Sequence, residues 1–292
     1  MQTRYRAAAT ALLLTATAGL AATGGSAEAS GAHHTSAKAG HLTVTITSSK
    51  KAVKLSVDQI RPGRTTFKVV RGHRGGGLLQ VMRLRKGYSL KHALSDFGKA
   101  FGQTTNVKAV RRIDKNVVFY GGMPAPAKGA PATKWAVNID ARDKYYAVNL
   151  DNKNKLSSFV VKGKHQKRSW PSADGRLNMA PGNVFKPGSN NAHKGWMNST
   201  NNAGEPHFII LNHVKKSTTL QQVSDCFAGT GPCDFRAADH AMADTGVISP
   251  GHTFRWKYHL PRGRYLAQCF WPSKVDGTPH AFMGMLSLFT MS

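Results

Sequence analysis

Acidic side chains are scarce in this chain of 292 residues, which has 14 Asp and Glu against 41 Lys and Arg. The formal net charge of +27 favours association with anionic partners, such as an acidic protein or an anionic polymer. The basic residues do not form a nucleic-acid-binding motif with interleaved aromatic side chains, so we do not expect a nucleic-acid partner. Three enzyme motifs are also missing: the Gly-x-Ser-x-Gly elbow, the phosphate loop and His-Glu-x-x-His.

Long apolar runs are missing as well, except near the N-terminus. Two arginines precede the apolar stretch Ala7–Ala22, which is followed by the small-x-small pattern Ala27-Glu28-Ala29. This order predicts a signal peptide over residues 1–29 and a secreted, extracytoplasmic protein. A membrane anchor is the alternative, but a span needs about 20 strongly apolar residues, and Thr and Gly interrupt this stretch. We therefore expect no membrane span in the mature form, and a disordered leader over residues 30–40.

Cysteine is rare too, with three residues, all in the C-terminal half. Cys226 and Cys233 lie close together, and the glycines and proline between them allow a turn that brings the two side chains into contact. In an oxidising compartment this predicts a disulfide, which would stabilise the fold by about 2 to 3 kcal/mol. Cys269 is then unpaired. It is either a buried, inert thiol or a ligand.

The remaining elements are short and rich in Val, Ile, Thr, Phe and Tyr, with turn residues between them. This pattern is typical of strands in β-sandwiches. Leu42–Thr47, for example, alternates apolar and polar residues as a half-buried strand does. Two stretches favour helices: Ser89–Phe101, with apolar residues at helical spacing, and the shorter Thr219–Cys226. The sequence therefore predicts an all-β protein with a few short helices.

Two parts of the chain share one pattern. The segment around Trp135 parallels the segment around Trp256, and Lys144–Asn149 parallels Arg264–Cys269, in the same order and with similar spacing. An internal duplication explains this similarity, and both tryptophans are then expected in the core. We predict two tandem Greek-key sandwiches, each with a short helix, over residues 41–161 and 179–292, joined by a linker over residues 162–178.

Soft and imidazole donors occur in separate stretches of the second half. His207 opens an apolar segment, Cys269 ends a strand-like run, and His280 and Met285 follow it. Two His and one Cys in a plane, with a weak axial Met, are the ligands of a type 1 copper site. Met283 is the alternative axial residue, because by parity it would share a strand face with Met285. The residue types thus suggest one copper ion.

The C-terminal half resembles the cupredoxin family. The resemblance depends on Pro206-His207, the turn Ser249-Pro250-Gly251 before an aromatic strand, the run Gly263-Arg264-Tyr265 that leads to the cysteine, and the His…Met return, and it covers residues 180–292. It implies a Greek-key sandwich with copper at one pole, acting in one-electron transfer or copper holding. We do not expect an enzyme, because the His-x-His pairs of a multicopper oxidase are absent.

The sequence departs from this family in the loop between Cys269 and His280. Ten residues, Phe270–Pro279, intervene, and the loop either returns compactly or carries His280 away from the cysteine. In the N-terminal copy the alignment places Gly77 opposite His207 and Asn149 opposite Cys269, so we expect no metal there. The alternative function is a metal-free cell-envelope sandwich whose basic surface binds anionic polymers or a protein partner.

Overall fold

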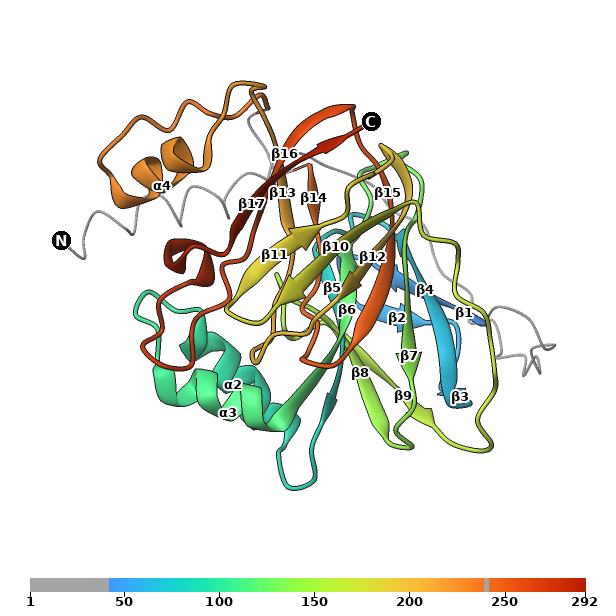
Figure 1. Cartoon of the computed structure of the whole chain (residues 1–292). Coiled ribbons are helices and arrows are strands. Elements are labelled where there is room, and N and C mark those ends of the chain that lie inside the picture. Colours follow the sequence, from blue (N-terminus) through green and yellow to red (C-terminus); the bar gives the residue numbers. More distant parts are fainter. Residues whose placement is uncertain (1–41, 239–241) are drawn as a thin grey trace.

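A computed structural model describes residues 42–238 and 242–292 (Figure 1). The predicted signal peptide, 1–29, and leader, 30–40, lie outside the described residues. Within the described ranges, no helix combines the length and the apolar character needed to cross a bilayer.

Strands make up most of the chain. The N-terminal half contains β1 Leu42–Ser48, β2 Val53–Leu55, β3 Gln59–Ile60, β4 Gly63–Arg71, β5 Leu78–Leu84, β6 Val117–Pro124, β7 Thr133–Ile139, β8 Lys144–Asn149 and β9 Leu156–Val161. The C-terminal half contains β10 Gly175–Ala180, β11 Val184–Pro187, β12 Lys194–Thr200, β13 Ile210–Val214, β14 Ala243–Asp244, β15 Thr253–His259, β16 Gly263–Gln268 and β17 Leu286–Met291. The alternating burial along β1 and β4 agrees with strands that have one face on the core.

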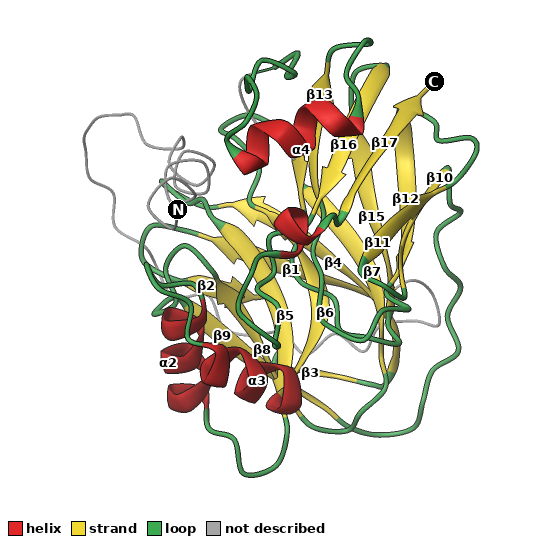
Figure 2. Cartoon of the chain, turned by 60° about the vertical axis from the view of Figure 1, so that its left-hand side comes forward, coloured by secondary structure: helices red, strands yellow, loops and turns green. Residues whose placement is uncertain are grey.

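One sheet extends through both halves. Its eight strands have the order β11-β10-β12-β15-β7-β4-β1-β2, and β15 pairs antiparallel with β7 so that Trp256 lies opposite Trp135. A five-stranded sheet, β3-β9-β8-β5-β6, covers the N-terminal part, and a four-stranded sheet, β14-β13-β16-β17, covers the C-terminal part (Figure 2). Both tryptophans are fully buried. The prediction of an all-β fold is confirmed.

The two halves also share one hydrophobic core. A single cluster contains Phe67 and Phe159 from the first half together with Phe254, Cys269 and Met285 from the second. β10 begins at Gly175, inside the range predicted as the linker. Packing is continuous across the proposed boundary. The division of the chain into two domains stays a prediction.

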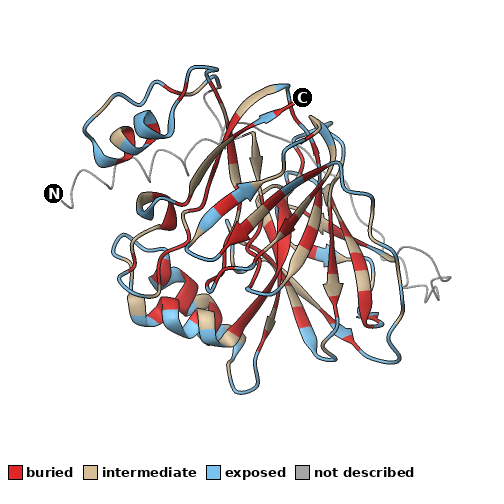
Figure 3. Ribbon diagram, in the orientation of Figure 1, coloured by how far each residue is buried: buried red, intermediate tan, exposed pale blue. Residues whose placement is uncertain are grey.

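Two helices lie where the sequence indicates them. α2 spans Leu90–Ala100 with Ser89 as its N-cap, and α4 spans Leu220–Ala228 with a capping box at Thr219. In Figure 1 all described helices lie on the left-hand side, and Figure 3 shows that their outer faces are exposed.

A third helix, α3 Val107–Asn116, was not expected, so the prediction of one helix per half is wrong for the first half. Its signals are the N-cap Asn106 and the buried residues Ala109, Val110 and Ile113 on one face. The lysines and arginines between them make the segment resemble a plain basic cluster. They occupy the solvent side of an amphipathic helix.

The carboxylate of Asp96 holds α2 and α3 together. It accepts hydrogen bonds from Tyr88 Oη at 2.6 Å and from Arg112 Nε at 2.7 Å and Nη2 at 2.5 Å, and Asp96 is only 4% exposed. The hydrogen bond from Arg112 is the largest cause that holds the pKa of Asp96 below its ordinary value, against the effect of burial. The ion pair therefore stabilises the folded protein when Asp96 is ionised.

Asp96→Asn should lower the free energy of unfolding by about 2 kcal/mol at neutral pH, because a charged acceptor of three hydrogen bonds is lost. In the wild type, the Asp96–Arg112 ion pair stabilises the fold fully above the ordinary carboxyl pKa of about 4. This stabilisation is lost as the pH falls through the lowered pKa of folded Asp96. Urea unfolding at neutral and acidic pH measures this difference. Asp234→Asn, which removes an exposed ion pair with Lys215, is the control and should have little effect. Equal stability of wild type and Asp96→Asn at neutral pH contradicts this assignment.

Candidate metal centre

Three predicted ligands meet at one point. The donor atoms of His207, Cys269 and His280 all lie within 4.8 Å of one another. His207 Nδ1 is 3.6 Å from Cys269 Sγ and 3.0 Å from His280 Nδ1. All three residues are 0% exposed. The ten-residue loop therefore does not carry His280 away from the cysteine.

Backbone hydrogen bonds to Ile248 fix His207, and the segment around Ile248 is in turn attached to the N-terminal half. His207 N donates to Ile248 O at 3.2 Å, and Ile248 N donates to His207 O at 2.8 Å. Ile248 in turn forms a bridge with Tyr120 of β6. Gln80 of β5 accepts from Val247 N at 2.6 Å and donates to Val247 O at 3.1 Å. The segment beside His207 is thus attached to the N-terminal half.

Cys269 directly follows β16 and lies in the shared core. Burial raises the pKa of its thiol to about 12. Burial, and then the neighbouring His280, lowers the pKa of His207 to about 3. Both side chains are neutral near pH 7 in the metal-free protein, so Cys269 would give up its proton on holding a metal ion as thiolate.

The loop from Phe270 to Pro279 folds back on itself. Pro272 lies opposite Pro279, and Ser273 N donates to Thr278 O at 2.9 Å. At its base, His280 N donates to Trp271 O at 3.0 Å, and Ala281 N donates to Cys269 O at 2.7 Å. The extra residues form a closed hairpin, and this base returns His280 to the cysteine. We call residues 270–279 the Cys–His hairpin.

The two candidate axial residues differ in environment. His280–Met283 form the 3₁₀ helix η1, and Gly284 has a left-handed backbone with φ 94°. The expectation that Met283 and Met285 share a strand face is therefore wrong. Met285 is 0% exposed and donates its N–H to His280 O at 2.9 Å, whereas Met283 is 52% exposed. Burial and the backbone hydrogen bond to His280 favour Met285 over Met283 as the candidate axial residue.

The corresponding position in the N-terminal half is closed by an amide. Asn149 Nδ2 donates to Gly76 O at 2.9 Å, and its Oδ1 accepts from Asp151 N at 3.0 Å. A Cβ on Gly77 would lie 2.4 Å from Asn149 Oδ1. The side chain at the position aligned with Cys269 thus occupies the space beside the position aligned with His207. The duplication itself stays a prediction.

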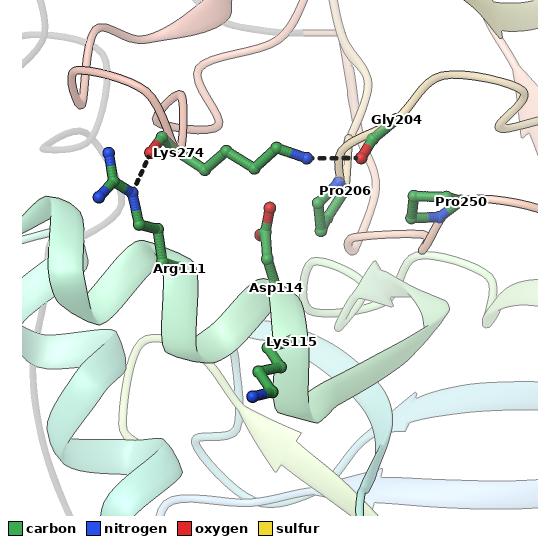
Figure 4. Close-up of a pocket in the computed structure, with 7 residues that line it drawn as sticks. All are labelled: Arg111, Asp114, Lys115, Gly204, Pro206, Pro250 and Lys274. Atoms are coloured by element: carbon green, nitrogen blue, oxygen red, sulfur yellow. Dashed lines mark hydrogen bonds between the residues drawn. The ribbon is translucent and has the colours of Figure 1, made fainter.

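A pocket of about 290 Å³ lies between α3 and the segments around Pro206 and Lys274 (Figure 4). Its lining residues are Arg111, Asp114, Lys115, Gly204, Pro206, Pro250 and Lys274. Burial, and then the charge of Glu205, raises the pKa of Asp114 to about 7. Figure 4 shows the Asp114 carboxylate pointing toward Lys274 and Pro206.

Two contacts near this pocket were missed by sequence reasoning. Arg111 of α3 donates from Nε to Lys274 O at 2.7 Å and from Nη2 to Val275 O at 3.1 Å, so the N-terminal half supports the Cys–His hairpin. Glu205 Oε2 accepts from Lys274 N at 3.0 Å and lies 3.4 Å from His280 Nε2. Burial opposes ionisation of Glu205, but contacts with His280 and the Lys274 amide hold its pKa below the ordinary value. Glu205 is one of few acidic residues and stands two places before His207, a signal that could have been used.

The predicted disulfide is confirmed. Cys226 and Cys233 are bonded, and the bond joins the end of α4 to the following loop. Cys269 has no disulfide partner. The one free thiol of the chain is thus the one beside the two imidazoles.

No protein-family model and no curated protein sequence matches this chain. Among solved structures, auracyanin B is 19% identical, covers 42% of this chain and 91% of its own, and has a TM-score of 0.28. Auracyanin A from Chloroflexus aurantiacus, described as a "blue" copper protein, is 14% identical over 40% of this chain and 96% of its own, with a TM-score of 0.25. The copper-containing nitrite reductase from Thermus scotoductus is 12% identical over 87% of this chain and 68% of its own, with a TM-score of 0.23. These similarities are too low to assign a function.

The donor set itself fits copper. Two imidazole nitrogens and one sulfur converge in a buried place, and a buried methionine follows η1. Thiolate and thioether sulfur suit Cu(I), and imidazole suits both common oxidation states of copper. Residues His207, Cys269 and His280 would hold the ion, with Met285 as the fourth candidate.

Arg111→Gln should loosen the Cys–His hairpin, because two hydrogen bonds to its backbone are lost. We expect amide hydrogen exchange at residues 273–277 to become about tenfold faster, which corresponds to about 1.4 kcal/mol of local stability. Lys115→Gln is the matched control: it removes one positive charge from the same helix and the same pocket. Equal exchange rates in wild type and Arg111→Gln would show that α3 does not support the hairpin.

Proposed function

We propose that this protein binds one copper ion through His207, Cys269 and His280, with Met285 as a weak axial ligand. The proposal depends on one observation: three donors from separate stretches of the chain lie within 4.8 Å of one another and are fully buried. Burial of a free thiol and two imidazoles costs desolvation free energy. Bonds from these donors to a metal ion would offset that cost.

The proposed activity is one-electron transfer or copper holding. Bound copper would supply the change between Cu(I) and Cu(II). The chain's own contribution is a stiff frame: β16 and the bridge to Ile248 fix Cys269 and His207, and the Cys–His hairpin fixes His280. Donors that keep their positions in both oxidation states reduce the rearrangement that accompanies electron transfer. Their burial also excludes water.

The place of action that we propose is outside the cytoplasm, as the N-terminal sequence suggests. The strongly positive charge, +27 for the full chain, suits an acidic redox partner or an anionic cell-envelope polymer there. A metal-free envelope protein that binds such a polymer is the second candidate. It is supported by the charge alone.

Titration of purified mature protein with Cu(II) separates these functions. We expect one equivalent to bind and an intense thiolate-to-copper absorption band to appear, because Cys269 Sγ is a direct donor. Cys269→Ser should abolish the band. A titration without any such band, with Cys269 unreactive toward thiol reagents until unfolding, supports the metal-free function instead.

The same titration distinguishes the two methionines. In Met285→Leu the band should persist but change in position, because the axial ligand tunes a type 1 site. Met283→Leu is the matched control and should behave like wild type, since this side chain is half exposed. A response to Met283→Leu alone would overturn the choice of Met285.

A further inference from the structure

A carboxylate lies directly behind His280. Glu205 Oε2 is 3.4 Å from His280 Nε2, and the side chains are 10% and 0% exposed. His280 Nε2 is buried and makes no hydrogen bond to any of the described residues. The opposite ring nitrogen, Nδ1, faces His207 Nδ1 at 3.0 Å. The imidazole of His280 thus has one edge toward the candidate ligands and the other toward Glu205.

Hydrogen bonds to its side chain and to its backbone fix the position of Glu205. Its Oε2 accepts from the backbone N–H of Lys274 in the Cys–His hairpin at 3.0 Å. Its backbone carbonyl accepts from Asn201 Nδ2 at 2.9 Å, and the same Nδ2 donates to Ile248 O at 2.9 Å. Glu205 also stands two residues before His207 in the sequence. One side chain therefore connects the His207 segment, the hairpin and the His280 ring.

If His280 held a metal ion through Nδ1, the proton of the neutral ring would lie on Nε2. Histidine ligands usually donate this second N–H to a carboxylate, a carbonyl or water, and the partner fixes the tautomer and the orientation of the ring. Glu205 is the carboxylate at that edge. A negative charge so close to the ring also favours the more highly charged state of a bound copper ion, because opposite charges attract strongly where water is excluded.

We propose that Glu205 is a positioning residue that holds His280 in the Nε2–H tautomer and stabilises Cu(II) relative to Cu(I). The inference rests on the proposed copper function and deepens it. Glu205 acts in two ways, through its contact with His280 and through its negative charge. A variant of a neighbouring carboxylate separates the two effects. Asp114 is a second carboxylate near Glu205, and it has no contact with either histidine among the hydrogen bonds and ion pairs of the described residues.

The test compares wild type, Glu205→Gln and the control Asp114→Asn, all loaded with copper. Glu205→Gln keeps the size of the side chain and removes its charge. We expect its Cu(II) affinity to fall about tenfold relative to its Cu(I) affinity, within the range known for partners of metal-bound histidines. For a one-electron couple this raises the reduction potential by about 59 mV. The comparison is made well above pH 7, because the pKa of Asp114 is raised to about 7 and its carboxyl must be ionised for the control. There Asp114→Asn should change the potential by less, since only a more distant charge is lost.

Pulsed electron paramagnetic resonance adds a readout of the contact itself. The quadrupole coupling of the remote imidazole nitrogen, Nε2, should change in Glu205→Gln and stay constant in Asp114→Asn. Equal potentials and equal remote-nitrogen signals in wild type and Glu205→Gln would overturn the inference. A shift of the same size in both variants would also overturn it, because charge without contact would explain that result.

Spectra of the metal-free protein test the role of Glu205 independently of copper binding. In nitrogen-15 spectra of the apo protein, the His280 ring signals should differ between wild type and Glu205→Gln and agree between wild type and Asp114→Asn. If no copper binds, the proposed function fails while these spectra still decide whether Glu205 orients His280. Identical His280 signals in wild type and Glu205→Gln reject the positioning role.

Discussion

The backbone ladder from Tyr120 through Ile248 to His207 is the constraint on which the candidate metal centre depends. It places a strand-like segment of the second half between β6 of the first half and the first histidine. Gln80 fixes this segment with hydrogen bonds to both polar groups of the Val247 backbone. Buried backbone groups must be paired. A shift of one half against the other would break these pairs and move His207 away from Cys269.

The N-terminal half thereby acts as a support for the second histidine as well. α3 holds the Cys–His hairpin through Arg111, and Asp96 holds α3 against α2. Trp271 of the hairpin packs edge-to-face on Phe101 and Phe119, with ring centroids 5.4 and 5.5 Å apart. The half without candidate ligands thus contributes to the site through the rigidity that it gives to the half that has them.

Much of the site could be predicted because its chemistry lies in residue types. The short strands predict a β-sandwich. The free Cys269, with a histidine on either side of it in the sequence, indicates the metal site. The Cys226–Cys233 bond followed from spacing and turn residues. The identity of each side chain can be read directly from a single sequence.

Features that depend on contacts between distant segments could not be predicted in this way. The shared eight-stranded sheet requires β15 to pair with β7, and no local pattern encodes that pairing. The return of His280 depends on hydrogen bonds at the base of the hairpin. α3 was missed because its outer face is so basic, and strand parity failed at Met283 because Gly284 ends a 3₁₀ turn. The role of Glu205 needed the position of His280.

X-ray absorption at the copper edge of the loaded protein tests the central claim most directly. A site made by Cys269, His207 and His280 predicts one short copper–sulfur distance and two copper–nitrogen distances from imidazole rings. Copper surrounded only by nitrogen and oxygen, without the short sulfur contact, would contradict the account.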